Sequence, residues 1–183
     1  ARGGNGVRVE TRGGDSPVFD AVVLAAHADE ALAMLAHPGP RESALLGAWE
    51  YSRNRVVLHT DGNFLPPVKR ARASWNYLRF AGHTGDDPAC LTYYMNRLQG
   101  IRGAVDYLVT LNPPREIRKE KIIAEFLYDH PVYTPAAVAT QKELPGLNGT
   151  GNVYFCGSYF NNGFHEDAVT AAVEAARHFG CSL

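Results

Sequence analysis

The C-terminal segment from Asn152 to Leu183 constrains the fold of this chain more than any other part. It begins with a short β-prone run, Val153–Cys156, which stops at Gly157. After a turn that contains Gly163, apolar residues recur at helical spacing between Ala168 and Phe179. The segment therefore predicts a strand, a glycine turn and then a helix.

A junction of this kind is suited to ligand binding. A glycine at a strand end lets a ligand approach the backbone closely, and a helix start presents free N–H groups and a partial positive charge. Glu166 and Asp167 stand at the expected helix start, and their charges oppose the binding of a phosphate there. A neutral, electron-rich group such as the carbonyl oxygen of a flavin ring suits the position better. The alternative is an ordinary βα unit that closes a domain.

The composition bounds the class of protein. A length of 183 residues allows one domain or two small ones, and 45% hydrophobic with 20% charged residues is usual for a soluble globular chain. The net charge of −1 favours neither nucleic acid nor an anionic membrane as a partner. Without a membrane-spanning apolar run, a signal peptide or paired cysteine motifs, the sequence predicts a cytoplasmic protein with reduced thiols.

The two ends of the chain differ from its middle in the helices and strands that their sequences predict. Near the N-terminus we expect a hairpin whose second arm, Val18–Ala26, is apolar on both faces and should lie inside a sheet. A short helix over Asp29–Leu35 should follow it, and the prolines at 38 and 40 should end that helix. Short helices are also expected over Ala44–Tyr51 and Ala136–Leu144. Five evenly spaced strands are expected in the middle, over Arg55–Thr60, Ala73–Arg79, Cys90–Asn96, Tyr107–Leu111 and Ile122–Tyr128. Such spacing indicates an antiparallel sheet.

The predicted fold class is α/β to α+β, with three segments along the chain. Residues 1–40 and 141–183 have α/β character, and residues 41–140 form a sheet-rich insert between them. The two end segments are expected to meet in one domain.

Five segments of the chain carry a resemblance through their order and spacing, namely Phe19–Asp29, Ser74–Tyr77, Leu91–Gln99, His130–Tyr133 and Val153–Ala168 with its two glycines. Together they resemble the flavin-containing amine oxidase superfamily, and more closely its bacterial branch of predicted NAD/FAD-binding oxidoreductases. The chain resembles only the C-terminal portion of a member. The resemblance implies a discontinuous FAD-binding domain, with residues 1–40 and 141–183 as its segments, and an antiparallel-sheet substrate domain over 41–140.

The same resemblance implies FAD as cofactor and a function as part of an FAD-dependent oxidoreductase, which removes a hydride equivalent from a small or lipid substrate. The expected partners are FAD, that substrate and the N-terminal portion of the same protein. The sequence does not give the oligomeric state, although unpaired sheet edges tend to associate and a homo-oligomer is one of the allowed forms. No metal site is expected, since neither His165 with its acidic neighbours nor His59 with Asp61 has the ligand clustering that a metal needs.

The resemblance also implies the cofactor-binding residues. Gly157 would let the backbone approach the pyrophosphate and ribityl region, and the N–H groups of Ala168 and Val169 would face the pyrimidine edge of the ring. The residues so implied at the turn and helix start are Gly157, Ser158, Gly163, Phe164, His165, Ala168 and Val169. Trp75 and Tyr77 are expected to line the substrate pocket, with core packing as the alternative. No catalytic residue is assigned.

The chain departs from the family pattern in two places. It lacks the GxGxxG loop that would hold the diphosphate of FAD, and Gly157 is followed by Ser158 where the wider family has an acidic residue. The alternative function is therefore a non-enzymatic domain, or a fragment that does not bind FAD alone and is inactive. A thiol enzyme using Cys156 with His165 is a further class, disfavoured because a cysteine on a buried strand is usually inert.

Overall fold

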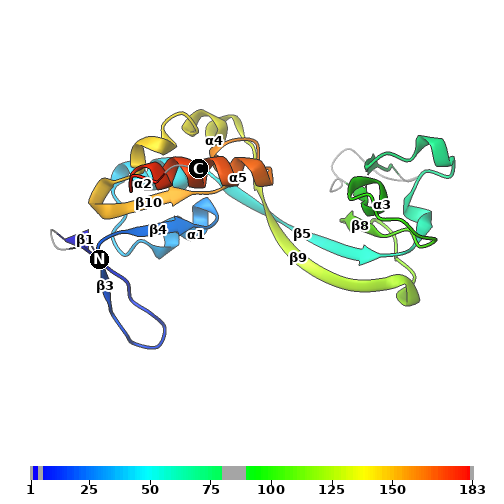
Figure 1. The fold of residues 1–183 in the computed structure, drawn as a ribbon, viewed down its shortest axis with the longest axis horizontal. Coiled ribbons are helices and arrows are strands. Elements are labelled where there is room, and N and C mark those ends of the chain that lie inside the picture. Colours follow the sequence, from blue (N-terminus) through cyan, green and yellow to red (C-terminus); the bar gives the residue numbers. More distant parts are fainter. Residues whose placement is uncertain (1, 4–5, 80–89, 182–183) are drawn as a thin grey trace. The chain divides into compact units, whose positions relative to one another are not determined.

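The computed structural model of the chain describes residues 2–3, 6–79 and 90–181. The chain forms two compact units, which Figure 1 shows as ribbons. Unit 1 contains Ala1–Ser52 together with Pro131–Leu183, and unit 2 is the continuous segment Arg53–His130. The chain thus leaves unit 1 after residue 52 and returns to it at residue 131. The sequence had predicted these two boundaries near residues 40 and 140.

Unit 1 is built around two parallel strands, β4 (Val22–Ala25) and β10 (Val153–Cys156), which lie 127 residues or more apart in the chain and pair in register from Val22 opposite Val153 to Ala25 opposite Cys156. The strand over Val153–Cys156 is thus confirmed. The main core of unit 1 includes Val153, Phe155 and residues of the helices α1 (Ala28–Met34) and α2 (Pro40–Leu46).

The last helix covers β10 from the other side. Helix α5 (His165–Arg177) packs Ala171 and Ala175 with Cys156 in a small apolar cluster. It begins three residues earlier than the apolar spacing indicated, because Asp167 accepts a hydrogen bond from the Phe164 N–H (2.8 Å) and so caps the helix at Phe164. The short helix α4 (Pro135–Thr140) and the 3₁₀ turns Leu144–Leu147 and Thr150–Asn152 lead into β10.

The N-terminal hairpin is confirmed, but its second arm differs from the prediction. Strands β1 (Arg2–Gly3), β2 (Gly6–Arg8) and β3 (Val18–Phe19) form an antiparallel sheet, with Val7 opposite Phe19. The predicted single strand Val18–Ala26 is split into β3 and β4, which belong to different sheets. A bend at Asp20, a residue type that favours turns, separates them and leaves Phe19 49% exposed rather than inside a sheet.

The helix expected over Ala44–Tyr51 is shifted toward the N-terminus. Helix α2 begins at Pro40, which the sequence had marked as a stop, and ends at Leu46, so Tyr51 lies in a strand. Proline is favoured at the first position of a helix because its missing N–H has no partner to lose there. The Glu42 carboxylate accepts a hydrogen bond from the Gly39 N–H (2.7 Å) and completes the cap.

Unit 2 contains most of a five-stranded sheet in the order β6–β7–β8–β5–β9. The pairs β6–β7, β7–β8 and β5–β8 are antiparallel, as predicted for the middle of the chain. The strands are β5 (Glu50–His59), β6 (Trp75–Tyr77), β7 (Leu91–Tyr94), β8 (Leu108–Leu111) and β9 (Ile122–Val132). The strand predicted to run to Asn96 ends at Tyr94, because the short helix α3 (Met95–Leu98) follows it. The described residues of the unit also form the 3₁₀ turns Gly62–Phe64, Lys69–Ala71 and Lys119–Lys121.

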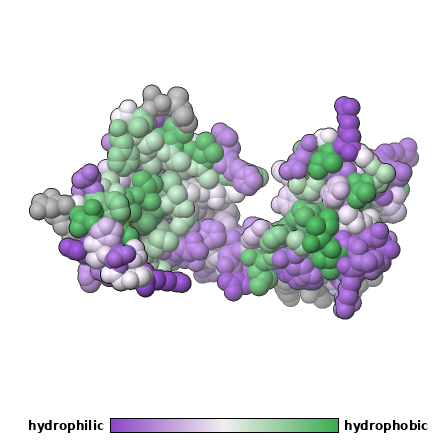
Figure 2. Space-filling view, turned by 60° about the horizontal axis from the view of Figure 1, so that its bottom comes forward, coloured by the Kyte–Doolittle hydropathy of each residue, from purple (hydrophilic) through white to green (hydrophobic). Residues whose placement is uncertain are grey.

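The two faces of this sheet differ in an unusual way. The face against the core of unit 2 contains a cross-strand row of three polar residues, Asn76, Thr92 and Thr110, all buried. The opposite face contains two cross-strand rows that are entirely apolar or aromatic, Trp75–Tyr93–Val109–Leu58 and Tyr77–Leu91–Leu111–Val56. We call this second face the aromatic face. Figure 2 shows hydrophobic residues on the surface of both units.

None of the helices in the described part of the chain is long and apolar enough to span a membrane.

Candidate functional site

An open hollow of about 400 Å³ lies at the carboxyl ends of the parallel strands β4 and β10. Four alanines line it, Ala25 and Ala26 at the end of β4 and Ala168 and Ala172 on α5. Its polar side chains include His27, Glu30, Ser158 and Tyr159, and none of the lysines and arginines among the described residues lines it. The carboxyl ends of parallel strands are where α/β folds commonly bind ligands, since backbone groups and helix starts converge there.

Gly157 lines this hollow. Glycine is needed at this position because a side chain would not fit there, and not because of the backbone angle. Its φ of 164° is extended backbone that any residue adopts. A Cβ atom at this position would stand 2.7 Å from Cε1 of Tyr159 and 3.1 Å from the carbonyl oxygen of Ala26. Only glycine therefore fits between the Tyr159 ring and the end of β4. Ser158, the next residue, also lines the hollow and starts a 3₁₀ turn over Ser158–Phe160.

The turn before α5 does not itself line the hollow. Gly163 has φ of 89°, and a Cβ atom there would lie 2.6 Å from Oη of Tyr133. Phe164 is the N-cap residue of α5 and is exposed, as is His165, the first residue of the helix. Of the seven residues predicted to bind the cofactor, the hollow is lined by three: Gly157, Ser158 and Ala168.

The predicted role of the Ala168 and Val169 N–H groups needs correction. Because α5 begins at His165, the Ala168 N–H already donates to the carbonyl oxygen of Phe164 (3.3 Å) and Val169 lies further inside the helix. Ala168 contributes its small side chain to the hollow instead. The N–H of Asp167 also donates to Phe164 (3.1 Å), so the first free donors of this helix lie before Asp167.

His27 and Glu30 are site residues that the sequence analysis did not single out. The His27 ring stacks on Tyr51, with ring centroids 4.5 Å apart and 16° between the planes. Tyr51 is held in turn because its Oη accepts a hydrogen bond from the Ala28 N–H (2.8 Å), and burial raises its pKa to about 12. Glu30 Oε2 accepts from the His27 N–H (3.3 Å) and lies 3.9 Å from His27 Nδ1. The spacing of His27 and Glu30 at a helix start was the available signal, since it matches a capping box.

Cys156 ends β10 at the hollow, but its environment does not make a nucleophile. The side chain is buried, and burial raises the pKa of its thiol. A catalytic cysteine needs the opposite shift, toward the thiolate. The thiol-enzyme interpretation therefore has no support from the pKa of this residue.

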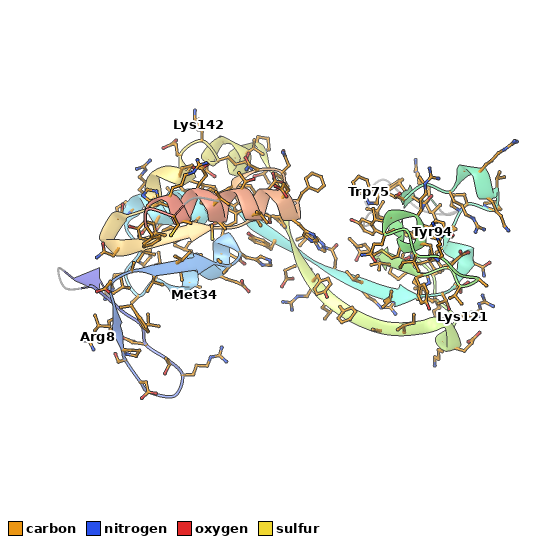
Figure 3. All side chains as sticks on the ribbon, viewed as in Figure 1. Arg8, Met34, Trp75, Tyr94, Lys121 and Lys142 are labelled. Carbon is orange, nitrogen blue, oxygen red and sulfur yellow. The ribbon has the colours of Figure 1, made fainter. Side chains whose placement is uncertain are left out.

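In unit 2, Trp75 and Tyr77 project from the edge strand β6 on the aromatic face. They are 55% and 60% exposed, so they are not core residues of this chain. The Trp75 ring packs edge-on against Tyr93 of β7, with centroids 6.3 Å apart. Figure 3 labels Trp75 on β6 and Tyr94 at the end of β7.

The buried polar side of unit 2 contains a directional hydrogen-bond chain. The Asp61 N–H donates to Nδ1 of His59 (3.1 Å), so the proton of the neutral imidazole is on Nε2, 2.8 Å from Oγ1 of Thr110. Thr110 Oγ1 is in turn 2.9 Å from Oγ1 of Thr92. Burial lowers the pKa of His59 to about 4, which agrees with a neutral ring.

Asp61 is paired with Arg118 beside this chain. Arg118 donates Nε and Nη2 to the two carboxylate oxygens (3.2 and 3.0 Å), and these hydrogen bonds lower the pKa of Asp61 to about 2. Across the described residues, 2–3, 6–79 and 90–181, no group of three or more His, Cys, Asp or Glu side chains is arranged to hold a metal ion.

Unit 1 contains a second cavity of about 620 Å³ on the other side of its parallel strands. Val7, Val9, Val22, Leu24 and Met34 make most of it apolar. None of the predicted site residues lines it.

The fold is mixed α/β with a hollow at the ends of two parallel strands, and comparison with known proteins assigns the family. Residues 1–178 match the flavin-containing amine oxidoreductases, and the chain belongs to that family. The predicted recognition is thus confirmed. No curated protein matches the sequence.

Among solved structures, the chain is similar to the crystal structure of a CLA-producing fatty acid isomerase from P. acnes, with a TM-score of 0.61 and 14% sequence identity. The similarity covers 98% of this chain and 46% of the isomerase chain. The chain therefore spans less than half the length of that protein, and at this identity the likeness concerns the fold alone.

Proposed function

We propose that this chain is the C-terminal part of an FAD-dependent, amine-oxidase-like oxidoreductase that removes a hydride equivalent from a small or lipid substrate. The observation that supports this most is the hollow at the ends of β4 and β10, in a chain that belongs to a flavin-containing family. Bound flavin would supply the acceptor for the hydride, and oxygen or another oxidant would then regenerate it.

The residues of the hollow fit the uncharged part of FAD better than its diphosphate. Four alanines leave room for a flat or extended group, and Ser158, His27 and Glu30 offer hydrogen bonds to it. The Glu30 carboxylate disfavours a phosphate at this place, as does the lack of a lining lysine or arginine from the described part of the chain. The diphosphate would need donors from the N-terminal portion of the protein, which we propose as a partner of this chain.

For the other predicted residues we retain more limited proposals. The exposed Phe164 and His165 start the helix that borders the hollow and would contact the rim of a bound flavin. Gly163 would act indirectly, by allowing the turn that places them. Val169 would pack against a neighbouring part of the cofactor or of the protein.

The aromatic face of unit 2 supports a substrate with apolar character. Trp75 and Tyr77 would contact it through their rings, since the eight positions of the two rows include no charged side chain. The similar solved structure is named a fatty acid isomerase, so an unsaturated fatty acid is a reasonable first compound to test.

The direct experiment is to purify the chain and record its visible spectrum, with and without added FAD. Retained or acquired flavin absorbance, with a rise in melting temperature on FAD addition, would support the proposal. Ala172→Leu, which fills the hollow, should weaken FAD binding at least tenfold. Thr170→Leu places the same side chain on an exposed position of α5 outside the hollow and should leave binding unchanged.

The second candidate is a domain or fragment that does not bind FAD by itself. It is favoured by the missing GxGxxG loop and by the parallel sheet of unit 1, which has two strands in the described part of the chain. A colourless protein that gains neither absorbance nor stability with FAD would support it. Co-expression with the proposed N-terminal portion would then separate a fragment, which acquires flavin, from a non-enzymatic domain, which does not.

A further inference from the structure

The charges of the chain are divided unequally between its two units. Unit 2 contains 12 lysine and arginine residues and 8 aspartate and glutamate residues, whereas unit 1 contains 6 and 11. Unit 2 therefore has a formal charge of +4 and unit 1 of −5, a separation that the net charge of −1 conceals. An anionic partner would meet a favourable electrostatic potential at unit 2 and an unfavourable one at unit 1.

The positive charge of unit 2 is concentrated in two segments. Residues 62–79 and 90–105 include six lysines and arginines and no acidic residue. The acids that border these segments, Asp61 and Asp106, are each paired with an arginine. The stretch between the segments, residues 80–89, contains two aspartates and lies outside the described residues. Four of the six basic side chains are exposed on one turn and one loop, namely Lys69, Arg70, Arg97 and Arg102.

Exposed aliphatic side chains lie among these cations. They are between 38% and 53% exposed, and they stand at the start of the 3₁₀ turn Lys69–Ala71, at the end of helix α3 and in the loop that follows α3. The four are Val68, Leu98, Ile101 and Val105. We call these four aliphatic residues and the four exposed cations the basic surface of unit 2.

Hydrogen bonds hold the turn and the loop of the basic surface together. The Asn96 side-chain amide donates to the carbonyl oxygen of Val105 (2.8 Å) and so closes the loop. Arg72, directly after the turn, pairs with Asp106, directly after the loop (3.3 Å). The Arg97 guanidinium also donates to the carbonyl oxygen of Arg72. The backbone of the basic surface is therefore ordered before a partner arrives, which lowers the entropy cost of binding.

We propose that the basic surface of unit 2 docks onto the face of a membrane that contains anionic lipids. The cations contact the lipid headgroups, and the aliphatic side chains enter the boundary between headgroups and acyl chains. A nucleic acid fits less well, because its bases stack on aromatic side chains and the side chains between these cations are aliphatic. The proposal does not depend on flavin binding, since the basic surface lies in unit 2 and the hollow in unit 1.

Sedimentation with lipid vesicles tests the docking. The purified chain is mixed with vesicles of phosphatidylcholine alone, or with vesicles in which about a third of the lipid is phosphatidylglycerol, and the bound fraction is measured. We expect the anionic vesicles to bind the chain about tenfold more tightly or better, and their advantage to fall when the salt concentration is raised from about 0.1 M to about 0.5 M. Binding to neither kind of vesicle, or equal binding to both, would overturn the proposal.

Variants of exposed residues test whether this surface is responsible. One cation near an anionic membrane changes the affinity about fivefold, so the double variant Lys69→Gln, Arg70→Gln should weaken binding to anionic vesicles about 20-fold. Ile101→Ser keeps every charge and should weaken it about fivefold, through the lost apolar contact.

A matched control separates the basic surface from the charge of the whole unit. The double variant Lys119→Gln, Lys121→Gln removes the same charge from a different 3₁₀ turn of unit 2 and should weaken binding less than about twofold. Melting temperatures of the three variants show whether the fold is intact. A control that loses as much affinity as the Lys69 and Arg70 variant would overturn the assignment to this surface.

Other partners of the basic surface give different results. A labelled single-stranded oligonucleotide that binds more tightly than the anionic vesicles would overturn the proposal in favour of a nucleic acid. Loss of vesicle binding when the chain is co-expressed with the proposed N-terminal portion would also overturn it, because the surface would then be a contact within a longer protein. A chain that binds anionic vesicles but no flavin would support the membrane proposal and reject only flavin binding by this chain.

Discussion

A Cβ atom at Gly157 would lie 2.7 Å from Cε1 of Tyr159, so the ring of Tyr159 occupies the space that a side chain on the strand end would need. Tyr159 is 1% exposed and belongs to the main core of unit 1. The end of β10, the hollow and the core of unit 1 are thus linked through this one contact.

Gly157→Ala should therefore destabilise unit 1. The methyl group must displace the Tyr159 ring or the end of β4, and overpacking of this kind costs about 1–3 kcal/mol. Urea unfolding measured by circular dichroism gives the change in unfolding free energy. Gly13→Ala is the matched control, because its Cβ would have only Oγ1 of Thr11 nearby, at 3.7 Å. Equal stabilities of the two variants would contradict the packing role of Gly157.

Gly163→Ala should cost more than the same change at Gly14. Both glycines have φ of 89°, so both changes place alanine in the left-handed region, at a cost of about 1 kcal/mol. At Gly163 the new Cβ also meets Oη of Tyr133 at 2.6 Å, whereas at Gly14 nothing lies within 4 Å. The difference in unfolding free energy between the two variants measures the contact. Adding Tyr133→Phe to Gly163→Ala removes that oxygen and should recover part of the loss; no recovery would show that backbone strain alone is responsible.

Tyr51, which is half-buried, and Tyr159, which is buried, should respond in opposite ways to loss of their hydroxyl groups. Tyr51→Phe removes the acceptor of the Ala28 N–H and should cost about 1–2 kcal/mol. The buried Oη of Tyr159 has no hydrogen-bond partner within the described residues, so Tyr159→Phe should be neutral or slightly stabilising. Melting temperatures of the two variants provide the comparison. A clear loss of stability in Tyr159→Phe would mean that its hydroxyl has a partner, such as a water molecule.

Unit 2 should lose stability between pH 6.5 and pH 4. His59 has an ordinary pKa of 6.5 when unfolded, and burial lowers it to about 4 in the folded chain. The unfolded state therefore binds a proton first as pH falls, and the loss approaches about 3 kcal/mol at pH 4. Amide exchange of Leu58 and Val109, beside His59, reports this unit separately from unit 1. His59→Gln should flatten the pH dependence in that range, and His178→Gln, on the exposed C-cap of α5, should not.

The Asp61–Arg118 pair should be asymmetric. Asp61 is 2% exposed, whereas the Arg118 side chain is 53% exposed. Arg118→Met leaves a buried carboxylate without its charged partner and should cost more than Asp61→Asn, after which the guanidinium turns to solvent. In Arg118→Met the pKa of Asp61 should rise from about 2 toward its ordinary value of 3.8, so the stability that the unchanged chain loses between pH 3.8 and pH 2 through this group should shrink. Acid titration of the unfolding free energy tests both statements. Equal losses of stability in Arg118→Met and Asp61→Asn would contradict the asymmetry of the pair.

Much of the fold followed from local pattern. Val153–Cys156 and Leu108–Leu111 are strands because short β-prone runs bounded by turn residues have few alternatives. The predictions that were wrong, the single strand over Val18–Ala26 and the helix over Ala44–Tyr51, concern element boundaries. There, a bend at Asp20 and a proline at the start of α2 outweighed apolar spacing, which cannot report where a hydrogen-bond pattern begins.

The residues of the candidate site also divide into those that the sequence could identify and those that it could not place. Gly157, Ser158 and Ala168 could be found from the sequence because they lie together at a strand–turn–helix junction. The spacing of His27 and Glu30 marks a helix start but could not place them at the hollow, since they reach it only because β4 pairs with β10 across more than a hundred residues of chain. From the amino-acid sequence one can predict the family, the strand–glycine–helix junction and the residue types available to a flavin. Which of those side chains share one hollow depends on the folded structure, because pairing between distant strands depends on the packing of the whole unit and not on local spacing.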